Sequence, residues 1–255
     1  MVADTFILTV DVERDWAAHG TLGITRCLPR FLDLLDRHHA TATFFVVADL
    51  VDLVRPLLPP GTRHEIASHG LTHRRLTDLG DDEVDHEVRR SRQRLEAAGY
   101  RVDGFRSPFW ASPPGLAGVL ADAGYGYDAS AGRMVPSLRR VAARPSGDRP
   151  GAPAGTALAT VASSVLRDGR TPLSLTYLRL LHPLGRRLVP TGTQQLSCHL
   201  HELLDDATGW EDLPRPLRRL HRRHCGPTAW RLLDDLLADR PAVSCRQHLA
   251  SRAAA

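Results

Sequence analysis

The feature that most constrains the fold is a regular alternation of strand-like and helix-like segments through the first half of the chain. Apolar runs typical of buried strands are followed by stretches whose apolar residues recur at helical spacing. A helix after a strand returns the chain for a parallel strand, so this order predicts an α/β fold, either a barrel or a doubly wound sheet. The predicted strands lie at 6–12, 41–47, 64–70, 104–110 and 126–130, and the predicted helices at 24–40, 49–58, 81–100 and 113–125.

The second half of the chain breaks this rhythm. Residues 131–172 are rich in Pro, Gly and Ala, and they are long for a loop inside a compact domain, which indicates a mobile segment or a functional lid. Beyond them we expect regular structure from 172–181, a strand at 193–202, one or two basic amphipathic helices at 213–238 and a closing strand at 242–246. A length of 255 residues suits one large α/β domain as well as two small ones.

The net charge of +4 and the isoelectric point near 9.2 raise the question of a nucleic-acid partner. All basic side chains are Arg, since the sequence contains no Lys, and five of them cluster at positions 215, 218, 219, 222 and 223. No stacking aromatics and no DNA-binding motif accompany the cluster, so we expect a solvated basic helix and no nucleic-acid binding. Attraction to a phosphate-bearing substrate or to an anionic membrane surface stays open.

The N-terminal segment "MVADTFILTVDVERDW" enters a strand directly and lacks the regions of a signal peptide. No apolar run reaches the length that spans a bilayer, so the expected location is the cytoplasm. The four cysteines are widely spaced and form no C-x-x-C pair, and we expect them to remain thiols.

Two carboxylates, Asp11 and Glu13, end the first predicted strand. Side chains two residues apart share one face of a strand, so both can point toward the carboxyl end of a parallel sheet, where α/β enzymes place their active sites. Buried there, the two charges would need partners or a cation. The alternative is a pair of surface acids that begin a loop.

A second candidate feature is the pair His69 and His73 in "HEIASHGLTHRRL". On a helical turn, residues four apart are neighbours, so both imidazoles could reach one metal ion. The chain has 13 histidines, and chance alone could produce this spacing. His64 fits neither spacing and is predicted to be structural.

Two further segments add groups that take part in proton transfer. Arg106 lies at a predicted strand end, where a guanidinium could orient a catalytic carboxylate and keep it ionised. His199 and His201 share one face of the late strand, directly before Glu202, and either imidazole could act as a general acid. A lone solvated Arg and a solvated His are the alternatives.

The order of these motifs resembles the polysaccharide deacetylase family, the NodB homology group also called carbohydrate esterase family four. The motifs are the Asp-x-Glu of the first strand, "SHGLTH", "FRSP", "YGYDAS" and "HLHE". The resemblance extends from about residue 5 to 248. It implies a distorted (β/α) barrel and a single catalytic domain over 1–255, with residues 131–172 as an insertion.

Carried over to this sequence, the resemblance implies a role for each matching residue. Asp11 corresponds to the catalytic base, Arg106 to the arginine that orients it, and His199 to the catalytic acid. His69 and His73 correspond to metal ligands, with Glu13 as the third ligand and Asp15 as its alternative. Asp128 corresponds to an acid that supports the pocket. Leu200 and His201 replace the Pro and the aromatic residue usual after the last histidine.

The resemblance thus implies a zinc-dependent hydrolase that removes an N-acetyl group from an amino sugar by attack of metal-bound water. With no secretion signal predicted, a lipid-linked, nucleotide-linked or natural-product sugar is the expected substrate, and membrane contact is expected only if that substrate is lipid-linked. The alternatives are a deformylase or other linear or cyclic amide hydrolase on the same scaffold, and a non-catalytic carbohydrate-binding homologue. The motifs do not distinguish a deacetylase from a deformylase or another amide hydrolase. They also indicate no oligomeric state.

Overall fold

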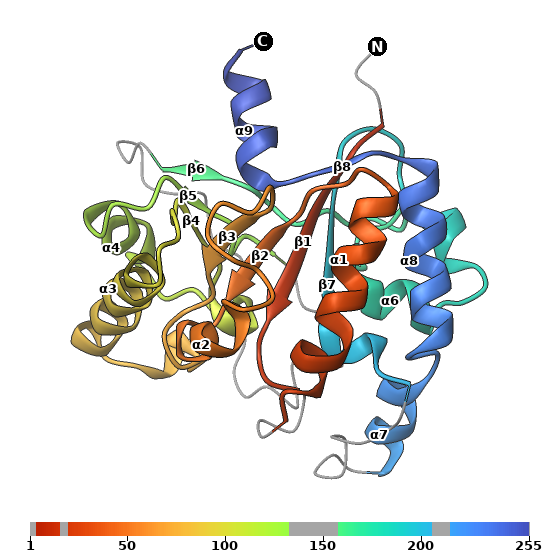
Figure 1. Cartoon of the computed structure of the whole chain (residues 1–255), viewed down its shortest axis with the longest axis horizontal. Helices are drawn as coiled ribbons and strands as arrows, with labels where there is room; N and C mark the ends of the chain where they lie inside the picture. Colours follow the sequence, from red (N-terminus) through yellow and green to blue (C-terminus); the bar gives the residue numbers. More distant parts are fainter. Residues whose placement is uncertain (1–3, 16–19, 133–157, 206–214, 255) are drawn as a thin grey trace. The chain divides into compact units, whose positions relative to one another are not determined.

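The computed structural model describes residues 4–15, 20–132, 158–205 and 215–254 (Figure 1). Contacts between residues group the chain into two compact units. The first comprises Met1–Phe44, Arg63–Glu65 and Ser164–Ala255, and the second comprises Phe45–Thr62 and Ile66–Ser163. The boundary falls within strand β2 (Thr43–Val46), so both units contain part of it.

The sheet of the first unit is built around β1 (Phe6–Val12), which has the predicted bounds. Strand β1 lies between β2 and β7 (Gln194–His199), and it pairs in parallel with β7 and with the short β8 (Ala242–Val243). Every residue of β1 is buried, as expected of a parallel strand covered on both faces. The strand predicted at 193–202 is shorter than expected, since β7 ends at His199. The residues that follow it form the 3-10 turn η6 (Leu200–Leu203).

The helices of the first unit follow the predicted pattern with different bounds. The helix predicted at 24–40 begins with a π-helical turn, η1 (Gly23–Cys27), and continues as α1 (Leu28–Arg37), with Pro29 in its first turn, where the missing N–H costs nothing. The segment predicted at 213–238 forms two helices, and a C-terminal helix that was not predicted follows β8. The other helices of the unit are α6 (Leu175–Leu180), η5 (Gly185–Leu188), α7 (Arg215–Arg222), α8 (Pro227–Asp239) and α9 (Cys245–Ala253).

The second unit carries the strands in the order β6-β5-β4-β3-β2, in which β4 pairs in parallel with β3 and with β5, and β5 with β6. Its strands are β3 (Glu65–Ser68), β4 (Gly104–Phe105), β5 (Tyr127–Asp128) and β6 (Ala159–Thr160). Strand β6 lies within the predicted insertion at 131–172, so part of that segment joins the sheet. Residues 133–157 of the insertion lie outside the described residues.

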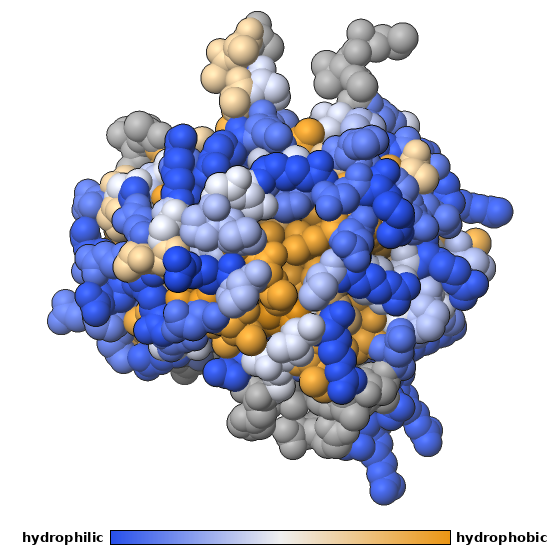
Figure 2. Space-filling model, viewed as in Figure 1, coloured by the Kyte–Doolittle hydropathy of each residue, from blue (hydrophilic) through white to orange (hydrophobic). Residues whose placement is uncertain are grey.

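Helix α3 (Asp81–Ala97) is the longest helix of the second unit and begins at the predicted residue. Its first turn carries three acids, which the positive end of the helix dipole stabilises. Its apolar face is buried, and its outward face is hydrophilic, as the left side of Figure 2 shows. The other helical segments are η2 (Ala48–Leu50), α2 (Val51–Val54), η3 (Leu76–Asp78), η4 (Pro108–Trp110) and α4 (Leu116–Asp122).

The parallel arrangement places the predicted site residues at strand ends. In the first unit, Asp11 is the register partner of His199, so the two side chains lie at the same level on neighbouring strands. In the second unit, His69 directly follows β3, Arg106 directly follows β4 and Asp128 ends β5. Within the part of the chain that the structure describes, no helix combines the length and apolar character needed to cross a membrane.

Candidate active site

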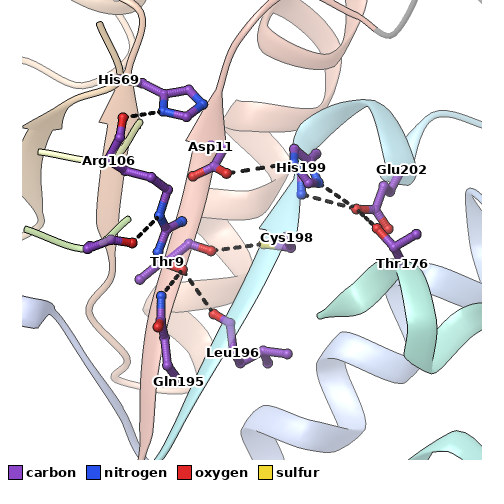
Figure 3. A network of polar contacts seen from close by, with 11 residues as sticks. Thr9, Asp11, His69, Arg106, Thr176, Gln195, Leu196, Cys198, His199 and Glu202 are labelled. Carbon is purple, nitrogen blue, oxygen red and sulfur yellow. Dashed lines mark hydrogen bonds and ion pairs between the residues drawn. The ribbon is translucent and has the colours of Figure 1, made fainter. Parts of the chain in front are cut away.

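In the first unit, the candidate site residues include the pair Asp11 and His199 at the ends of β1 and β7 (Figure 3). Asp11 is 2% exposed, and its Oδ2 lies 3.7 Å from His199 Nε2. Below them the two strands are linked by polar contacts, including the bond from Thr9 Oγ1 to the Leu196 carbonyl at 3.3 Å. A buried carboxylate and an imidazole are thus held side by side, the two groups that a hydrolase needs for proton transfer.

Glu202 holds the other nitrogen of His199. His199 Nδ1 lies 2.9 Å from Glu202 Oε1, and the His199 backbone N–H donates to the same oxygen at 3.3 Å. Burial by itself would lower the pKa of His199. The hydrogen bond to Glu202 and the charges of Glu13, Glu202 and Asp11 outweigh burial and raise this pKa to about 9. His199 is therefore protonated at neutral pH and can donate a proton from Nε2.

His201 differs from His199 although both come from the same motif. The two rings stack with centroids 5.1 Å apart. Burial, and after it the charge of His199, lower the pKa of His201 to about 4. His201 is therefore neutral at neutral pH, and the geometry favours His199 over His201 as the general acid.

His199, His201 and Glu202 also offer ligand atoms within 4.8 Å of one another, which raises the question of a metal site here. Arg179 argues against it, since its Nε donates to Glu202 Oε2 at 3.0 Å. Both side chains of this ion pair are buried, with exposures of 1% and 0%. A guanidinium already supplies the positive charge that the carboxylate needs, and it would repel a second cation.

The first motif and the residues just after it contain three acids, Asp11, Glu13 and Asp15. One of them, Asp15, forms hydrogen bonds with backbone N–H groups. Asp15 is 4% exposed and accepts hydrogen bonds from Leu22 N at 2.7 Å and Gly23 N at 2.9 Å. It thus fixes the start of η1, whereas Glu13 is half-buried and lies just beyond the end of β1. This difference favours Glu13 over Asp15 as the third ligand of the predicted metal site.

In the second unit, the candidate site residues include the pair His69 and His73, whose ring centroids are 5.1 Å apart. His69 is 2% exposed, and its Nδ1 lies 2.9 Å from the Arg106 carbonyl oxygen. A carbonyl oxygen only accepts, so Nδ1 is the donor of this hydrogen bond, and Nε2 is the ring nitrogen that could serve as a metal ligand. Imidazole ligands of metals usually donate their second ring N–H in this way.

The prediction that the two histidines share a helical turn is wrong. Residues 69–75 form no helix, and the left-handed backbone at Gly70 (φ 79°) and His73 (φ 64°) turns the chain instead. The turn is held by Glu87 of α3, which accepts bonds from Leu71 N at 2.9 Å, from Thr72 N at 3.0 Å and from the Thr72 hydroxyl. Sequence reasoning missed Glu87; the available signal was an acid on the apolar face of an amphipathic helix.

Arg106 is fully buried, and its guanidinium lies over two aromatic rings, 4.1 Å from the centroid of Phe45 and 4.5 Å from that of Trp110. Beside it, burial raises the pKa of Asp128, although hydrogen bonds from Ser130 and the charge of Arg106 oppose this shift. The arginine is thus held rigidly by stacking, which a flexible Lys side chain would not allow.

The loop after β4 presents an aromatic side chain to solvent. Phe109 and Trp110 both have left-handed backbones, with φ of 58° and 55°, which costs energy in residues that are not glycine. Phe109 is 40% exposed, and its ring centroid lies 4.7 Å from that of His73. Such strain with an exposed aromatic residue beside a histidine indicates a surface for a ligand.

The six predicted site residues therefore fall into two groups. Asp11, Glu13 and His199 belong to the first unit, and His69, His73 and Arg106 belong to the second. The first group contains the contact between Asp11 and His199, and the second contains the neighbouring rings of His69 and His73.

Comparison with known sequences finds a family that the first part of the chain matches. Residues 3–127 match the family described as polysaccharide deacetylase. A segment of 76 residues is 33% identical to a chitooligosaccharide deacetylase from Rhizobium leguminosarum bv. phaseoli, covering 28% of this chain and 33% of the relative. The corresponding enzyme from Bradyrhizobium sp. (strain ANU 289) is 36% identical over 76 residues, covering 28% of this chain and 34% of the relative. The match thus spans about one third of the length of these curated relatives.

Solved structures extend the likeness over nearly the whole chain. A CE4 family pseudoenzyme from Bacillus anthracis superposes with a TM-score of 0.58 at 14% identity, covering 96% of this chain and 65% of that one. A mutant of the peptidoglycan deacetylase PdaC from Bacillus subtilis gives 0.54 at 14% identity, covering 96% and 89%. At this identity the likeness shows the fold alone, and it confirms the predicted α/β fold of the deacetylase type.

The predicted resemblance to the polysaccharide deacetylase family is therefore confirmed. Residues 3–127 carry the sequence pattern of that family, and the chain has its fold.

Proposed function

We propose that this chain is a metal-dependent N-deacetylase that removes the acetyl group from an amino sugar. The observation that carries the proposal is the pair Asp11 and His199, in which a buried carboxylate lies 3.7 Å from an imidazole that stays protonated at neutral pH. Amide hydrolysis needs one group that takes a proton from water and another that gives a proton to the departing amine. Neighbouring strands hold both groups here.

Three residues are suited to hold zinc: Glu13, His69 and His73 each offer one ligand atom of the kind that zinc binds. The hydrogen bond from His69 Nδ1 to the Arg106 carbonyl fits this role, because it leaves Nε2 as the ligand atom. When bound, zinc would lower the pKa of a water molecule and polarise the amide carbonyl. The metal-ligand role of all three residues is part of the proposal.

The proton transfers follow from the chain's own residues. Asp11 takes a proton from the water that attacks the acetamide carbon, and the C–O bond forms. His199 then gives the proton on Nε2 to the amide nitrogen as the C–N bond breaks, which yields acetate and a free amine. Arg106, which stacks on Phe45 and Trp110, keeps Asp11 ionised in this proposal.

The substrate class we propose is an N-acetylated sugar that is lipid-linked, nucleotide-linked or part of a natural product. The support is the family and the exposed ring of Phe109 beside His73, which gives an apolar face for the substrate. A formylated sugar or a cyclic amide would use the same proton transfers. A non-catalytic homologue remains the second candidate, because a CE4 family pseudoenzyme has the same fold.

The test is to incubate the zinc-loaded protein with a panel of acetylated and formylated amino sugars and to quantify free acetate and formate. Release of acetate supports the proposal, and release of formate alone would make the protein a deformylase. Binding of an acetylated sugar, seen by calorimetry without release of either acid, would favour the non-catalytic homologue.

Glu13→Ala is expected to weaken zinc binding by on the order of tenfold or more, because it removes one of three protein ligands. Asp15→Ala is the matched comparison, since this acid lies two residues further on and bonds to backbone N–H groups. It should keep its zinc and lose about 1–2 kcal/mol of unfolding free energy. Calorimetric zinc titration and thermal unfolding measure the two effects, and the opposite pattern would transfer the ligand role to Asp15.

Glu87→Gln is expected to weaken zinc binding by roughly tenfold, because the turn that joins His69 and His73 loses a charged acceptor of two backbone N–H groups. Glu83→Gln is the control, since Glu83 lies one turn earlier on α3 and its side chain is 52% exposed. Zinc titration of both folded variants checks the prediction. Equal affinities would mean that the turn keeps its shape without Glu87.

A further inference from the structure

Both carboxylate oxygens of the buried Glu202 accept hydrogen bonds. Its Oε1 accepts hydrogen bonds from the backbone and the ring of His199, and from Thr176 Oγ1 at 2.8 Å. Its Oε2 accepts from Arg179 Nε at 3.0 Å. The carboxylate is fully buried, and these bonds to α6 and to the end of β7 leave it one orientation (Figure 3).

Arg179 is itself held from a third direction. One of its terminal nitrogens donates to the carbonyls of His221 and Arg223, both at 2.7 Å. The guanidinium therefore connects α6, the end of α7 and η6 within the first unit. Since these contacts fix Arg179, they also fix the carboxylate that it bonds, and through that carboxylate the ring of His199.

The bond to Nδ1 decides which nitrogen of His199 can react. Glu202 accepts from Nδ1–H, so that proton stays in place, and Nε2 faces Asp11. The charged groups around the ring are Asp11 of β1, Glu13 just after β1, Glu202 of η6 and Arg179 of α6, and the neutral ring of His201 in η6 is a further titratable neighbour. Glu202 bonds directly to the ring, at Nδ1.

We propose that Glu202 is a positioning residue, which holds His199 with Nε2 toward the departing amine and keeps the imidazole in its protonated form. This inference rests on the proposed deacetylase function for its catalytic meaning, although the bond itself does not depend on it. His199, the proposed proton donor, and Glu202 lie three residues apart in the chain. Neither the charge pattern nor the motif in the sequence gives Glu202 a role.

The test uses Glu202→Gln in the zinc-loaded protein, since Gln has nearly the same shape and can still accept from Nδ1 but carries no charge. Histidine-selective NMR, assigned with His199→Ala, follows the titration of the His199 ring. We expect the ring of the unaltered protein to keep its Nδ1 proton and to titrate well above the ordinary range. In Glu202→Gln its proton affinity should fall by about tenfold or more, which is a shift of one pKa unit.

Turnover is measured in parallel on two probes, a chitooligosaccharide as the amide and 4-nitrophenyl acetate as an ester that needs no protonated leaving group. In Glu202→Gln we expect kcat on the amide to fall by on the order of tenfold or more, with KM, zinc content and ester hydrolysis unchanged. The basic limb of the kcat profile should move to lower pH. A residue that only supports the fold would change both probes alike.

Thr176→Val keeps the test open if Glu202→Gln fails to fold, because it removes one bond to Oε1 at a half-buried position. It should cause a smaller change of the same kind. An unchanged His199 titration in the folded variants would overturn the proposal. If the NMR shift is found but the unaltered protein releases no acetate from any amide, the positioning role stands and the deacetylase function fails.

Discussion

His199→Ala is expected to keep its zinc and to lose on the order of a hundredfold or more in turnover of an amide, the usual scale for a general acid. Zinc can activate water, but an amine leaves only when a proton reaches its nitrogen. In the proposed reaction this proton comes from Nε2 of His199, whose pKa Glu202 and the neighbouring acids raise. Steady-state kinetics on an acetylated sugar, together with metal analysis, checks both parts of the expectation.

His201→Ala is the matched control for this variant. Its ring stacks on His199, but it is neutral at neutral pH, so its removal should cost much less turnover. An ester with a good leaving group should be nearly insensitive to the loss of His199. Equal losses on the amide and on the ester would mean that His199 positions the substrate or stabilises charge, and the general-acid role would have to be withdrawn.

His73→Ala is expected to lose bound zinc and amide hydrolysis together. The ring of His73 lies 5.1 Å from that of His69, and removing one imidazole leaves two ligands, too few for a stable zinc site. The activity should fall toward the uncatalysed rate, because no other group in the proposed reaction lowers the pKa of water. Metal content by atomic emission and acetate release from the same preparation measure the two losses.

The exposed His86 of α3 provides the control for His73, since His86→Ala removes an imidazole from the same unit without touching the turn. It should retain zinc and activity. Stoichiometric zinc in His73→Ala would contradict the assignment. In that case His199, His201 and Glu202 would need to be tested as ligands despite the arginine that already neutralises Glu202.

The strands and the order of the motifs could be predicted from the sequence because both depend on local patterns. Strand β1 has the predicted bounds, and the parallel arrangement places Asp11, His69, Arg106 and His199 at strand ends or directly after them. The alternation of strands and helices is enough for this result, since the carboxyl ends of neighbouring parallel strands share one edge.

The supporting contacts could not be predicted, because they join residues that are distant in the sequence. No local pattern reveals that β7 pairs directly with β1 or that Arg179 of α6 reaches Glu202. The spacing of His69 and His73 predicted a helical turn, but left-handed residues and the bonds to Glu87 form a different turn. Choosing between Glu13 and Asp15 likewise required the bonds of Asp15 to the backbone of η1.

The short distance along the chain between His199 and Glu202 has an evolutionary consequence. Because the proton donor and the carboxylate that holds it lie within four consecutive residues, insertions and deletions elsewhere in the gene cannot separate them. The pair can be inherited, transferred or lost as one unit. Arg179, by contrast, comes from another helix, and it must be retained independently. A lineage that drifts toward a non-catalytic form can therefore lose the proposed donor through a single codon change at His199, or weaken it through one at Glu202.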